Sequence, residues 1–391
     1  MGENAPEEVP TDYPDSKSPS LHLTTATEEE KVATWNLNSV NWGTALSLSD
    51  YLERESYLTT VPLAKDNGVT HWILVSKDLP HNERPILASC ESLCKPVLVS
   101  RNGIITEGIT HGIGSVFSQP KYRGKGYAAR MLRELGRILK SWQIDSSVSG
   151  REAVPFSILY SDIGPKYYAK FGWEVHPSSH IALPPISSKS SSSSSSSNSG
   201  TPLTYADIPS LCKLDEHLLR KRLAETKDGK THVAILPTND QMQWHHMRED
   251  FVTKKIFGKS PTIKGAIAGP EGKRVWAIWT RAFYGPLKPE SGNTFHILRL
   301  VLEDETDNEQ NAESLKSILD IAQEEAKEWQ LNEVEMWNPS EVVRSLVRRT
   351  ELEHKVEHRE EESIPSLMWY GDEETKAGDI WWVANEKYGW C

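Results

Sequence analysis

The most regular alternation of apolar and polar positions lies in residues 127–142. Apolar side chains recur there every three or four positions, at Ala128, Met131, Leu132, Leu135, Ile138, Leu139 and Trp142. This spacing places them on one face of a helix. The sequence therefore predicts an amphipathic helix that buries this face against a sheet.

Strands are predicted on both sides of this helix. Residues 70–76 and 85–100 are rich in strand-forming residues and are separated by Asp, Pro, His and Asn, which predicts a hairpin. Residues 109–117 predict a third strand, and residues 155–164 predict an apolar strand with a polar end. A short helix follows from Pro165 and ends at Gly172.

The segment before the hairpin predicts one short strand and two helices. Residues 21–27 favour a strand, and Thr27 with Glu30 forms a capping box that starts a helix at Glu28. A second helix is expected from about Ser49. The resulting order of strand, helix, helix, three strands, helix, strand and helix predicts a mixed α/β fold.

The second half of the chain has a similar order of predicted helices and strands. Helices are expected in residues 239–257 and 312–329 and after Pro339. Strands are expected in residues 274–285, 294–304 and 331–337 and in part of 379–391. The similarity lies in the order of elements alone, because no residues match at a fixed period. It suggests a diverged copy of the first half.

Composition divides the chain into four parts. Residues 1–20 are rich in Pro, Glu and Ser and are expected to be a flexible tail, and residues 187–200 are a polyserine run expected to be a flexible linker. These segments separate a first domain, residues 21–186, from a second domain, residues 201–391. A length of 391 residues is sufficient for two domains.

The overall composition narrows the classes of function. The net charge of −11 argues against non-specific binding to nucleic acid or to an anionic membrane, and it is compatible with a cationic small molecule. No apolar run approaches the ~20 residues of a membrane span. The four cysteines form no dense framework and no secretory signal peptide is recognised, so we expect reduced thiols and a cytoplasmic protein.

Metal binding is not expected from the sequence. Cys90 and Cys94 have no second ligand pair at zinc-site spacing and are expected to be buried strand thiols. His245 and His246 are neighbours on a predicted helix and point in different directions, so we expect solvated or capping histidines.

The chemistry is concentrated where the amphipathic helix begins. Gly124 and Gly126 lie at the helix start, with Lys121, Arg123 and Lys125 around them. Backbone N–H groups at a helix N-terminus carry partial positive charge, and glycine allows a phosphate to approach them closely. The segment is therefore either a phosphate-binding turn or an ordinary turn with solvated charges. It is neither a P-loop nor a dinucleotide fingerprint, because the required residues are absent.

Two motifs resemble the GNAT acetyltransferases. Lys121 to Gly126 follows the family pattern Gln/Arg-x-x-Gly-x-Gly/Ala, with lysine in the first place and Ala128 behind the second glycine. Residues 166–173 resemble the family signature Phe-Tyr-x-x-x-Gly-Phe, with Tyr168 at the tyrosine. Residues 109–117, 159–164 and 381–391 further resemble fungal lysine N-acetyltransferases. The resemblance implies a GNAT domain followed by a second, degenerate GNAT-like α/β lobe.

The resemblance also implies acetyl-CoA as co-substrate. Backbone amides from Arg123 to Gly126 are then expected to bind the pyrophosphate. Val116 and Ser118 are expected to pair with the pantetheine arm, with Ser161 and Asp162 beside it. A backbone N–H near Val116 would stabilise the oxyanion. The full set of expected cofactor-binding residues is Val116, Ser118, Lys121, Arg123, Gly124, Lys125, Gly126, Ala128 and Ser161.

The transfer also requires a base that takes a proton from the amine and an acid that gives a proton to the leaving thiolate. A lysine ε-amine has a pKa of about 10.4, so at pH 7 only about one molecule in 2,500 is neutral and a base is expected. Glu91 and His111 are candidates, although each is also compatible with a structural strand residue. Tyr168 occupies the family position of the acid that protonates the thiolate, and neighbouring Tyr167 is the alternative.

The second domain is expected to close the acceptor site. A cationic amine would be faced by acidic and aromatic residues near the C-terminus: Asp379, Trp381, Trp382 and Glu386. The alternative is that the two tryptophans form part of the core between the lobes. Residues 304–313 are strongly acidic where a second pyrophosphate loop would lie, so one CoA site is expected per chain.

The sequence thus favours an N-acetyltransferase for a small cationic amine. Free L-lysine is the first choice of substrate. The alternatives are another small amine, a protein lysine, or a non-catalytic CoA-binding scaffold. Neither nucleic acid nor membrane is expected as a partner.

Overall fold

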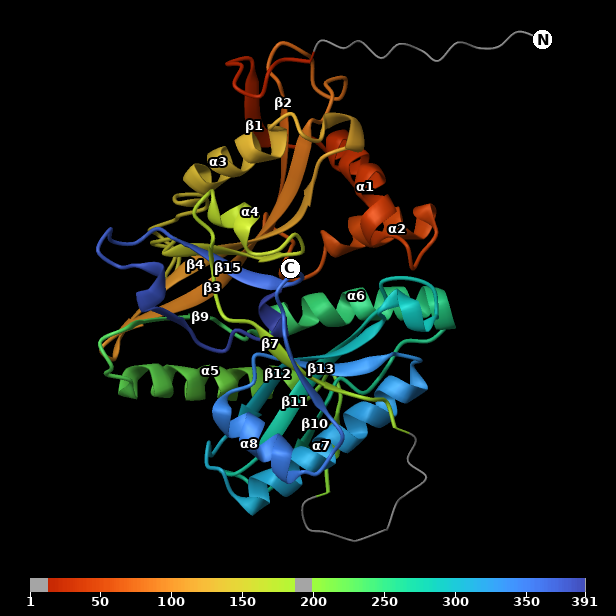
Figure 1. Cartoon of the computed structure of the whole chain (residues 1–391), viewed down its shortest axis with the longest axis vertical. Helices are drawn as coiled ribbons and strands as arrows, with labels where there is room; N and C mark the ends of the chain where they lie inside the picture. Colours follow the sequence, from red (N-terminus) through yellow and green to blue (C-terminus); the bar gives the residue numbers. More distant parts are fainter. Residues whose placement is uncertain (1–12, 187–198, 391) are drawn as a thin grey trace, which may run out of the picture.

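The computed structural model describes residues 13–186 and 199–390. Two mixed β-sheets dominate it, one in the upper and one in the lower half of Figure 1. The first sheet has the strand order β1 (Leu21–Thr25), β2 (Val69–Ser76), β3 (Ala88–Arg101), β4 (Ile104–Phe117), β5 (Phe156–Ser161), β15 (Ile364–Trp369) and β6 (Glu174–Val175). Two more strands, β9 (Thr231–Ile235) and β16 (Ile380–Trp382), extend it sideways from β3.

The second sheet repeats the strand order of the first. It runs β8 (Thr201–Leu203), β10 (Gly265–Ala268), β11 (Val275–Ala282), β12 (Thr294–Leu302), β13 (Glu333–Trp337), β7 (Ser179–Leu183) and β14 (Lys355–His358). In each sheet the fourth and fifth strands are parallel and a long helix connects them. The structure therefore shows the repeated architecture that the order of elements suggested.

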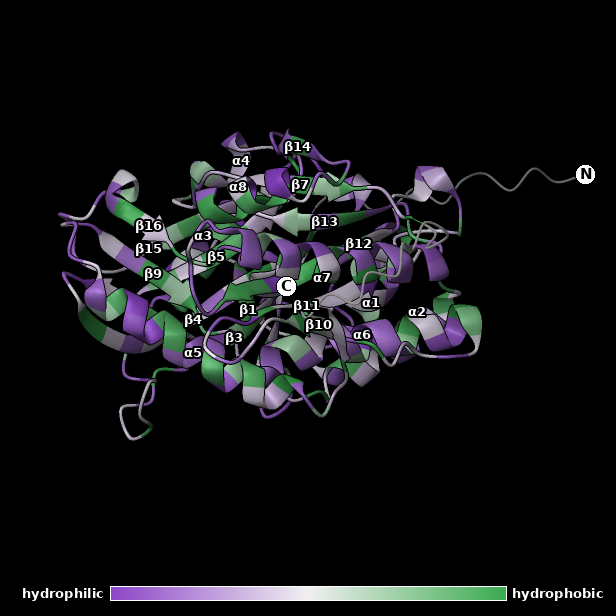
Figure 2. Cartoon of the chain, turned by 90° about the horizontal axis from the view of Figure 1, so that it is seen from below, coloured by the Kyte–Doolittle hydropathy of each residue, from purple (hydrophilic) through white to green (hydrophobic). Residues whose placement is uncertain are grey.

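Eight α-helices in the described residues flank the sheets. Those of the first half are α1 (Glu28–Trp42), α2 (Leu48–Leu58), α3 (Tyr127–Leu139) and α4 (Lys166–Ala169). Those of the second half are α5 (Ile208–Glu225), α6 (Asn239–Phe257), α7 (Glu309–Glu328) and α8 (Glu341–Arg349). In Figure 2, α5 carries both hydrophilic and hydrophobic bands, as expected of a helix that covers a sheet with one face.

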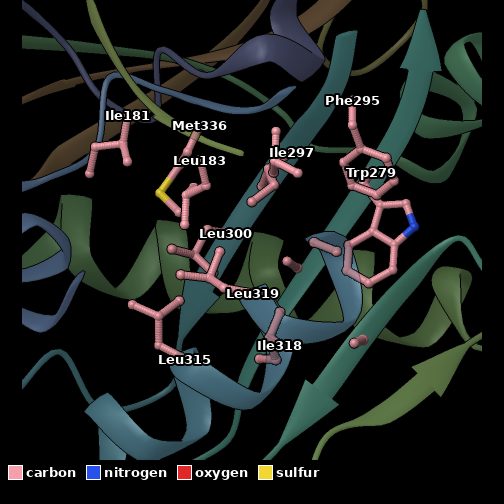
Figure 3. Close-up of a cluster of buried hydrophobic side chains, with 14 of the residues drawn as sticks. Ile181, Leu183, Trp279, Phe295, Ile297, Leu300, Leu315, Ile318, Leu319 and Met336 are labelled. Atoms are coloured by element: carbon pink, nitrogen blue, oxygen red, sulfur yellow. The ribbon is translucent and has the colours of Figure 1, made fainter. Parts of the chain in front are cut away.

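The two halves exchange strands. β15 comes from the end of the chain and pairs with β5 from Ile364↔Ser161 to Trp369↔Phe156. β7 precedes the polyserine run and pairs with β13 in the second sheet. In Figure 3, Ile181 and Leu183 of β7 lie among the core side chains of the second half, such as Met336. The predicted boundary at residues 187–200 therefore does not separate the two sheets.

A further core cluster joins the two sheets. It contains buried side chains from both halves of the chain: Val97, Phe156, Val233, Trp276, Leu298, Leu367 and Tyr388 among others. The largest fully buried side chains include Trp173, Trp276 and Trp279. Much of the high tryptophan content therefore serves packing within and between the lobes.

This exchange makes a prediction about truncation. A chain ending at residue 186 loses β15 and exposes the free edge of β5, whose Phe156, Ile158 and Leu159 are at most 2% exposed in the full chain. Since each buried side chain of this size contributes ~1.5–3 kcal/mol, we expect the fragment not to fold. Circular dichroism during heating should show no cooperative transition. A cooperative transition of the fragment alone would contradict the structural importance of the exchange.

Local predictions in the first half are confirmed. The Thr27–Glu30 capping box starts α1, the predicted hairpin is β2–β3, and α3 buries Met131, Leu132, Leu135 and Leu139. The sequence pattern missed α5 and several short strands, including β7, β9 and β15. These segments form strands because they pair with strands that are distant in sequence.

Part of the expected flexible tail is packed. The Tyr127 hydroxyl donates to the Pro14 carbonyl at 2.9 Å, and Arg130 Nη1 donates to the Ser16 carbonyl at 3.1 Å. The rings of Tyr13 and Tyr122 lie 5.0 Å apart. The prediction of a free tail is therefore wrong for residues 13–20. Residues 1–12, and the predicted linker except for its last two residues, lie outside the described part of the chain.

Candidate active site

A cavity of about 640 Å³ lies where the first sheet meets the second half of the chain. Its walls come from α1, α2, β3, β4, β5, α4, α6 and the C-terminal segment. Of the residues expected at the site, the cavity brings together Glu91, Val116, Ser118, Arg123, Ala128, Asp162, Tyr167 and Tyr168. The glycines of the basic turn lie on the exposed loop that follows Arg123.

The cavity opens because β4 and β5 separate. Their parallel pairing includes Gly112↔Ile158 and ends at Ile113↔Leu159. Just beyond this point, the register between β3 and β4 shifts, and Ser115 has a φ of 52°. Such a bulge bends its strand and disrupts the ladder. Val116 and Ser118 thus lie beyond the last β4–β5 pair, where a ligand can lie against β4.

The basic turn has the form expected of a phosphate cradle. Gly124 and Gly126 have φ values of 76° and 85°, which L side chains rarely adopt. Among the described residues no side chain caps the N-terminus of α3. The free N–H groups of the first turn and the nearby cations therefore fit the pyrophosphate of an acyl-CoA.

The equivalent turn of the second half is built differently. There the Asn308 side chain accepts from the Asn311 N–H and caps α7. Glu303, just before this turn, pairs with Arg274, and Asp307 in the turn pairs with Arg349. The capped helix and the acidic turn agree with the expectation of one CoA site per chain.

Glu91 has the properties of a base. Its side chain is 17% exposed and lines the cavity. Burial, with the nearby Glu55 carboxylate, raises the pKa of Glu91 to about 7, although the hydrogen bond from Ser115 at 3.3 Å opposes this shift. His71 Nε2 lies 3.4 Å from Glu91, but burial lowers the pKa of His71 to about 4, so the imidazole is neutral near pH 7.

Tyr168 has the properties of an acid. Its ring is buried and borders the cavity, and burial raises the pKa of its hydroxyl, which stays protonated at neutral pH. No hydrogen-bond partner for this hydroxyl occurs among the described side chains and backbone groups. Tyr167 also borders the cavity, with its ring 5.2 Å from that of Tyr168 in an edge contact.

His111 and Ser161 do not line the cavity. The His111 side chain is fully buried and its Nε2 lies 3.1 Å from the Trp142 carbonyl; burial lowers its pKa to about 4. Ser161 is also buried and its hydroxyl donates to the Gly164 carbonyl at 2.7 Å. The structure therefore corrects both assignments: each side chain is enclosed and serves local structure. Asp162 and Ile163 line the cavity beside Ser161 instead.

The acceptor residues expected near the C-terminus also lie elsewhere. Trp381 is 56% exposed with Lys230 over its ring, and Trp382 is buried against Tyr160 and His176. Glu386 pairs with Arg299 and accepts from the Leu300 N–H. None of these three side chains, nor the exposed Asp379, lines the cavity. Trp382 belongs to the core between the lobes, as the alternative interpretation held for the tryptophans, whereas the exposed Trp381 does not.

The second half nevertheless contributes a wall of the cavity. This wall contains Trp244 and Arg248 of α6 and Trp390 of the C-terminal segment. The rings of Trp244 and Trp390 lie 6.1 Å apart, and Lys95 Nζ donates to the Gly389 carbonyl at 2.8 Å, which holds this segment in place. Burial, with nearby Arg54, lowers the pKa of Arg248 to about 10.

Sequence reasoning missed this wall and the charged groups of α2. Arg54 is buried beside Glu55, with its Nη2 donating to the Glu55 carboxylate at 2.6 Å. Tyr51 of the same helix lies under the Arg54 guanidinium. All three line the cavity. In the sequence, α2 carries charged residues close to apolar ones. A helix that lines a cavity and a helix that faces solvent can both have this pattern, so the sequence could not identify these residues.

In residues 13–186 and 199–390, no group of three or more His, Cys, Asp or Glu side chains could hold a metal ion. His245 and His246 are buried, with ring nitrogens near the Tyr388 and Trp279 carbonyls, so the expectation of solvated or capping histidines is wrong. Cys90 and Cys94 are buried in β3 as expected. No described helix is long and apolar enough to cross a bilayer.

The fold and the site agree with a comparison to known protein families. Residues 180–391, more than half of the chain, match the family described as the LYC1 GNAT-like C-terminal domain. The chain therefore belongs to the GNAT superfamily of acetyltransferases, in its LYC1-like group.

Individual relatives support this classification. An uncharacterized protein of Saccharomyces cerevisiae, YGR111W, is 24% identical over 387 residues, covering 90% of this chain and 93% of the yeast protein. A protein of Yarrowia lipolytica named lysine acetyltransferase is 34% identical over 151 residues, covering 36% of this chain and 37% of that protein. A GCN5-related N-acetyltransferase from Anabaena variabilis has a similar fold, with a TM-score of 0.52, 15% identity, and coverage of 90% of this chain and 73% of that chain.

Proposed function

We propose that this protein transfers an acetyl group from acetyl-CoA to the amine of a small cationic substrate, with free L-lysine as the first candidate. The observation that carries the proposal is a single cavity that lies at the split between β4 and β5 and is lined by both Glu91 and Tyr168. The name of the Yarrowia lipolytica relative supports lysine as the amine.

Acetyl-CoA fits the residues of the first half. Gly124, beside which nothing lies within 4 Å, leaves room just before α3 for its pyrophosphate, and Lys121, Arg123 and Lys125 supply positive charge. Bound here, it supplies an activated thioester for attack by an amine. The extended backbone of Val116 lies where the β4–β5 ladder has ended, and a peptide N–H near this bulge would donate to the developing oxyanion.

Glu91 would prepare the amine for attack. An amine with a pKa of about 10.4 reaches the site mainly as the ammonium ion. A carboxylate with a pKa near 7 is ionised in about half of the molecules at that pH and accepts the ammonium proton. The negative charge of the same carboxylate attracts the cation before the transfer. Glu91 therefore acts both in binding and in proton transfer.

Tyr168 would protonate the thiolate that leaves. Tyr168→Phe removes only the hydroxyl, so we expect kcat to fall about 100-fold while the KM for acetyl-CoA changes little. Tyr167→Phe is the matched control, since it removes a neighbouring hydroxyl from the same cavity. Steady-state kinetics of both variants checks the assignment. A loss confined to the Tyr167 variant would transfer the role of acid to that residue.

The proposal is tested by thiol release from acetyl-CoA with a panel of amines. The panel contains L-lysine, ornithine, polyamines, aromatic amines and a peptide with an internal lysine. We expect saturable release with L-lysine. Turnover of another small amine alone would keep the mechanism and change the substrate, and preference for the peptide would indicate a protein substrate. Binding of acetyl-CoA without turnover of any amine would indicate a scaffold.

A further inference from the structure

We propose that Arg248 of α6 binds a carboxylate of the acceptor and thereby selects amino acids over simple amines. This inference rests on the proposed function, and it concerns the opposite wall of the same cavity. Arg248 belongs to the second half of the chain, whereas the acetyl-CoA site belongs to the first half. The second lobe would then recognise the part of the substrate that does not react.

Arg248 lies between two hollows of the structure. Its side chain is half-buried and borders both the main cavity and the smaller adjoining space beside Tyr284 and Lys387. Its guanidinium lies 5.9 Å from the centre of the Trp390 ring. Trp244, one turn earlier on α6, borders the same cavity. The guanidinium thus lies at the cavity wall beside the Trp390 ring.

No carboxylate in the described residues pairs with Arg248. Its neighbours on α6 are bound elsewhere. Glu249 Oε2 accepts from Lys264 at 2.6 Å and its Oε1 accepts from Arg281 Nη1 at 2.8 Å. Asp250 accepts from the same Lys264 and from the Tyr205 hydroxyl, each at 2.6 Å.

The acidic residues of α2, the helix beside α6, are also paired with other cations. Glu55 accepts twice from Arg54, at 2.6 and 2.8 Å. Asp50 and Glu53 lie 2.8 and 2.7 Å from Lys255 Nζ on α6. Within residues 13–186 and 199–390, Arg248 is therefore left without a paired carboxylate. Burial, together with the nearby Arg54 guanidinium, lowers the pKa of Arg248, and the Glu55 carboxylate only partly offsets this.

The chemistry of Arg248 indicates the kind of ligand. A half-buried guanidinium that has no counterion among the described residues favours an anion, and its planar fork suits a carboxylate. The pyrophosphate of acetyl-CoA is provided for at the separate turn before α3, so the anion at Arg248 is expected to come from the acceptor. Glu91 lies in the same cavity and is suited to the amine. A molecule with an amine at one end and a carboxylate at the other satisfies both groups, as an amino acid does.

The experiment compares L-lysine with 1,5-diaminopentane, which is lysine without its carboxylate. Both are tested as acceptors with the full-length wild type and with Arg248→Gln. For the wild type we expect the KM for the diamine to exceed that for lysine by about 30-fold or more. In Arg248→Gln we expect the KM for lysine to rise by a similar factor, while the KM values for the diamine and for acetyl-CoA stay within about threefold. Lys254→Gln, on the exposed side of α6, is the matched control.

The outcomes separate this inference from the proposed function. If the wild type acetylates lysine and the diamine equally well, or if Arg248→Gln weakens both alike, the function stands and the role of Arg248 is refuted. If the wild type acetylates neither amine, lysine is not the acceptor, and both that part of the proposed function and the inference fail. If Arg248→Gln does not fold, the wild-type comparison still decides whether a carboxylate matters. Arg248→Lys then tests the residue, with a partial loss expected for lysine alone.

Discussion

Replacing Gly124 by Asp should raise the KM for acetyl-CoA about 100-fold and leave the fold intact. The new carboxylate would project from the turn that receives the pyrophosphate. Repulsion between like charges at a binding site costs several kcal/mol, and a hundredfold loss corresponds to about 2.7 kcal/mol. Nothing lies within 4 Å of a Cβ at Gly124, so no clash in the free protein accounts for the effect.

The matched control for this variant is Gly229→Asp. Gly229 also has a positive φ, 77°, and nothing within 4 Å of a Cβ, but it lies before β9 and outside the cavity. Both variants therefore introduce the same side chain into the same backbone conformation. Kinetics with varied acetyl-CoA and a thermal melt of each variant complete the test. Equal effects of the two substitutions on the KM would contradict a phosphate-binding role for the turn before α3.

Replacing Glu91 by Gln should lower kcat/KM for lysine about 10²–10⁴-fold at pH 7 and change the pH profile. In the wild type, protonation of Glu91 removes the base. Because its pKa is raised to about 7, kcat/KM should fall tenfold per pH unit below pH 7 and level off above it. In the variant only the free amine reacts. Its kcat/KM should then continue to rise toward the pKa of the amine, about 10.4, without a bend near pH 7.

The control for Glu91 is Glu107→Gln, which removes an exposed carboxylate from β4 at a distance from the cavity. We expect this variant to keep both the rate and the bend near pH 7. The profiles are measured by thiol release at constant ionic strength from pH 6 to pH 9. A bend near pH 7 that persists in Glu91→Gln would assign the base to another group.

The first half of the fold could largely be predicted from sequence because its signals are local. The Thr27–Glu30 capping box, the apolar face of α3 and the glycines at its start each depend on residues that are close in the chain. The exchange of β7 and β15 could not be predicted in this way. Each strand is only five or six residues long and pairs with a partner more than 150 residues away.

The candidate site shows the same division. The turn at Gly124 and the Tyr168 motif could be found from local patterns. For the base, the sequence left two candidates, Glu91 and His111. The structure favours Glu91 because His111 is enclosed and hydrogen bonded to a backbone carbonyl. Arg248 had no signal at all. Its importance arises only because the acids around it on α2 and α6 pair with other cations.

The most direct test of the account is to identify the product formed from acetyl-CoA and L-lysine by the purified protein. Mass spectrometry should show lysine that has gained one acetyl group, in amounts equal to the CoA released, and about 100-fold less of this product with Gly124→Asp at low acetyl-CoA. Release of CoA without acetylated lysine, or no release in the presence of lysine, would contradict the proposal that this chain acetylates the free amino acid.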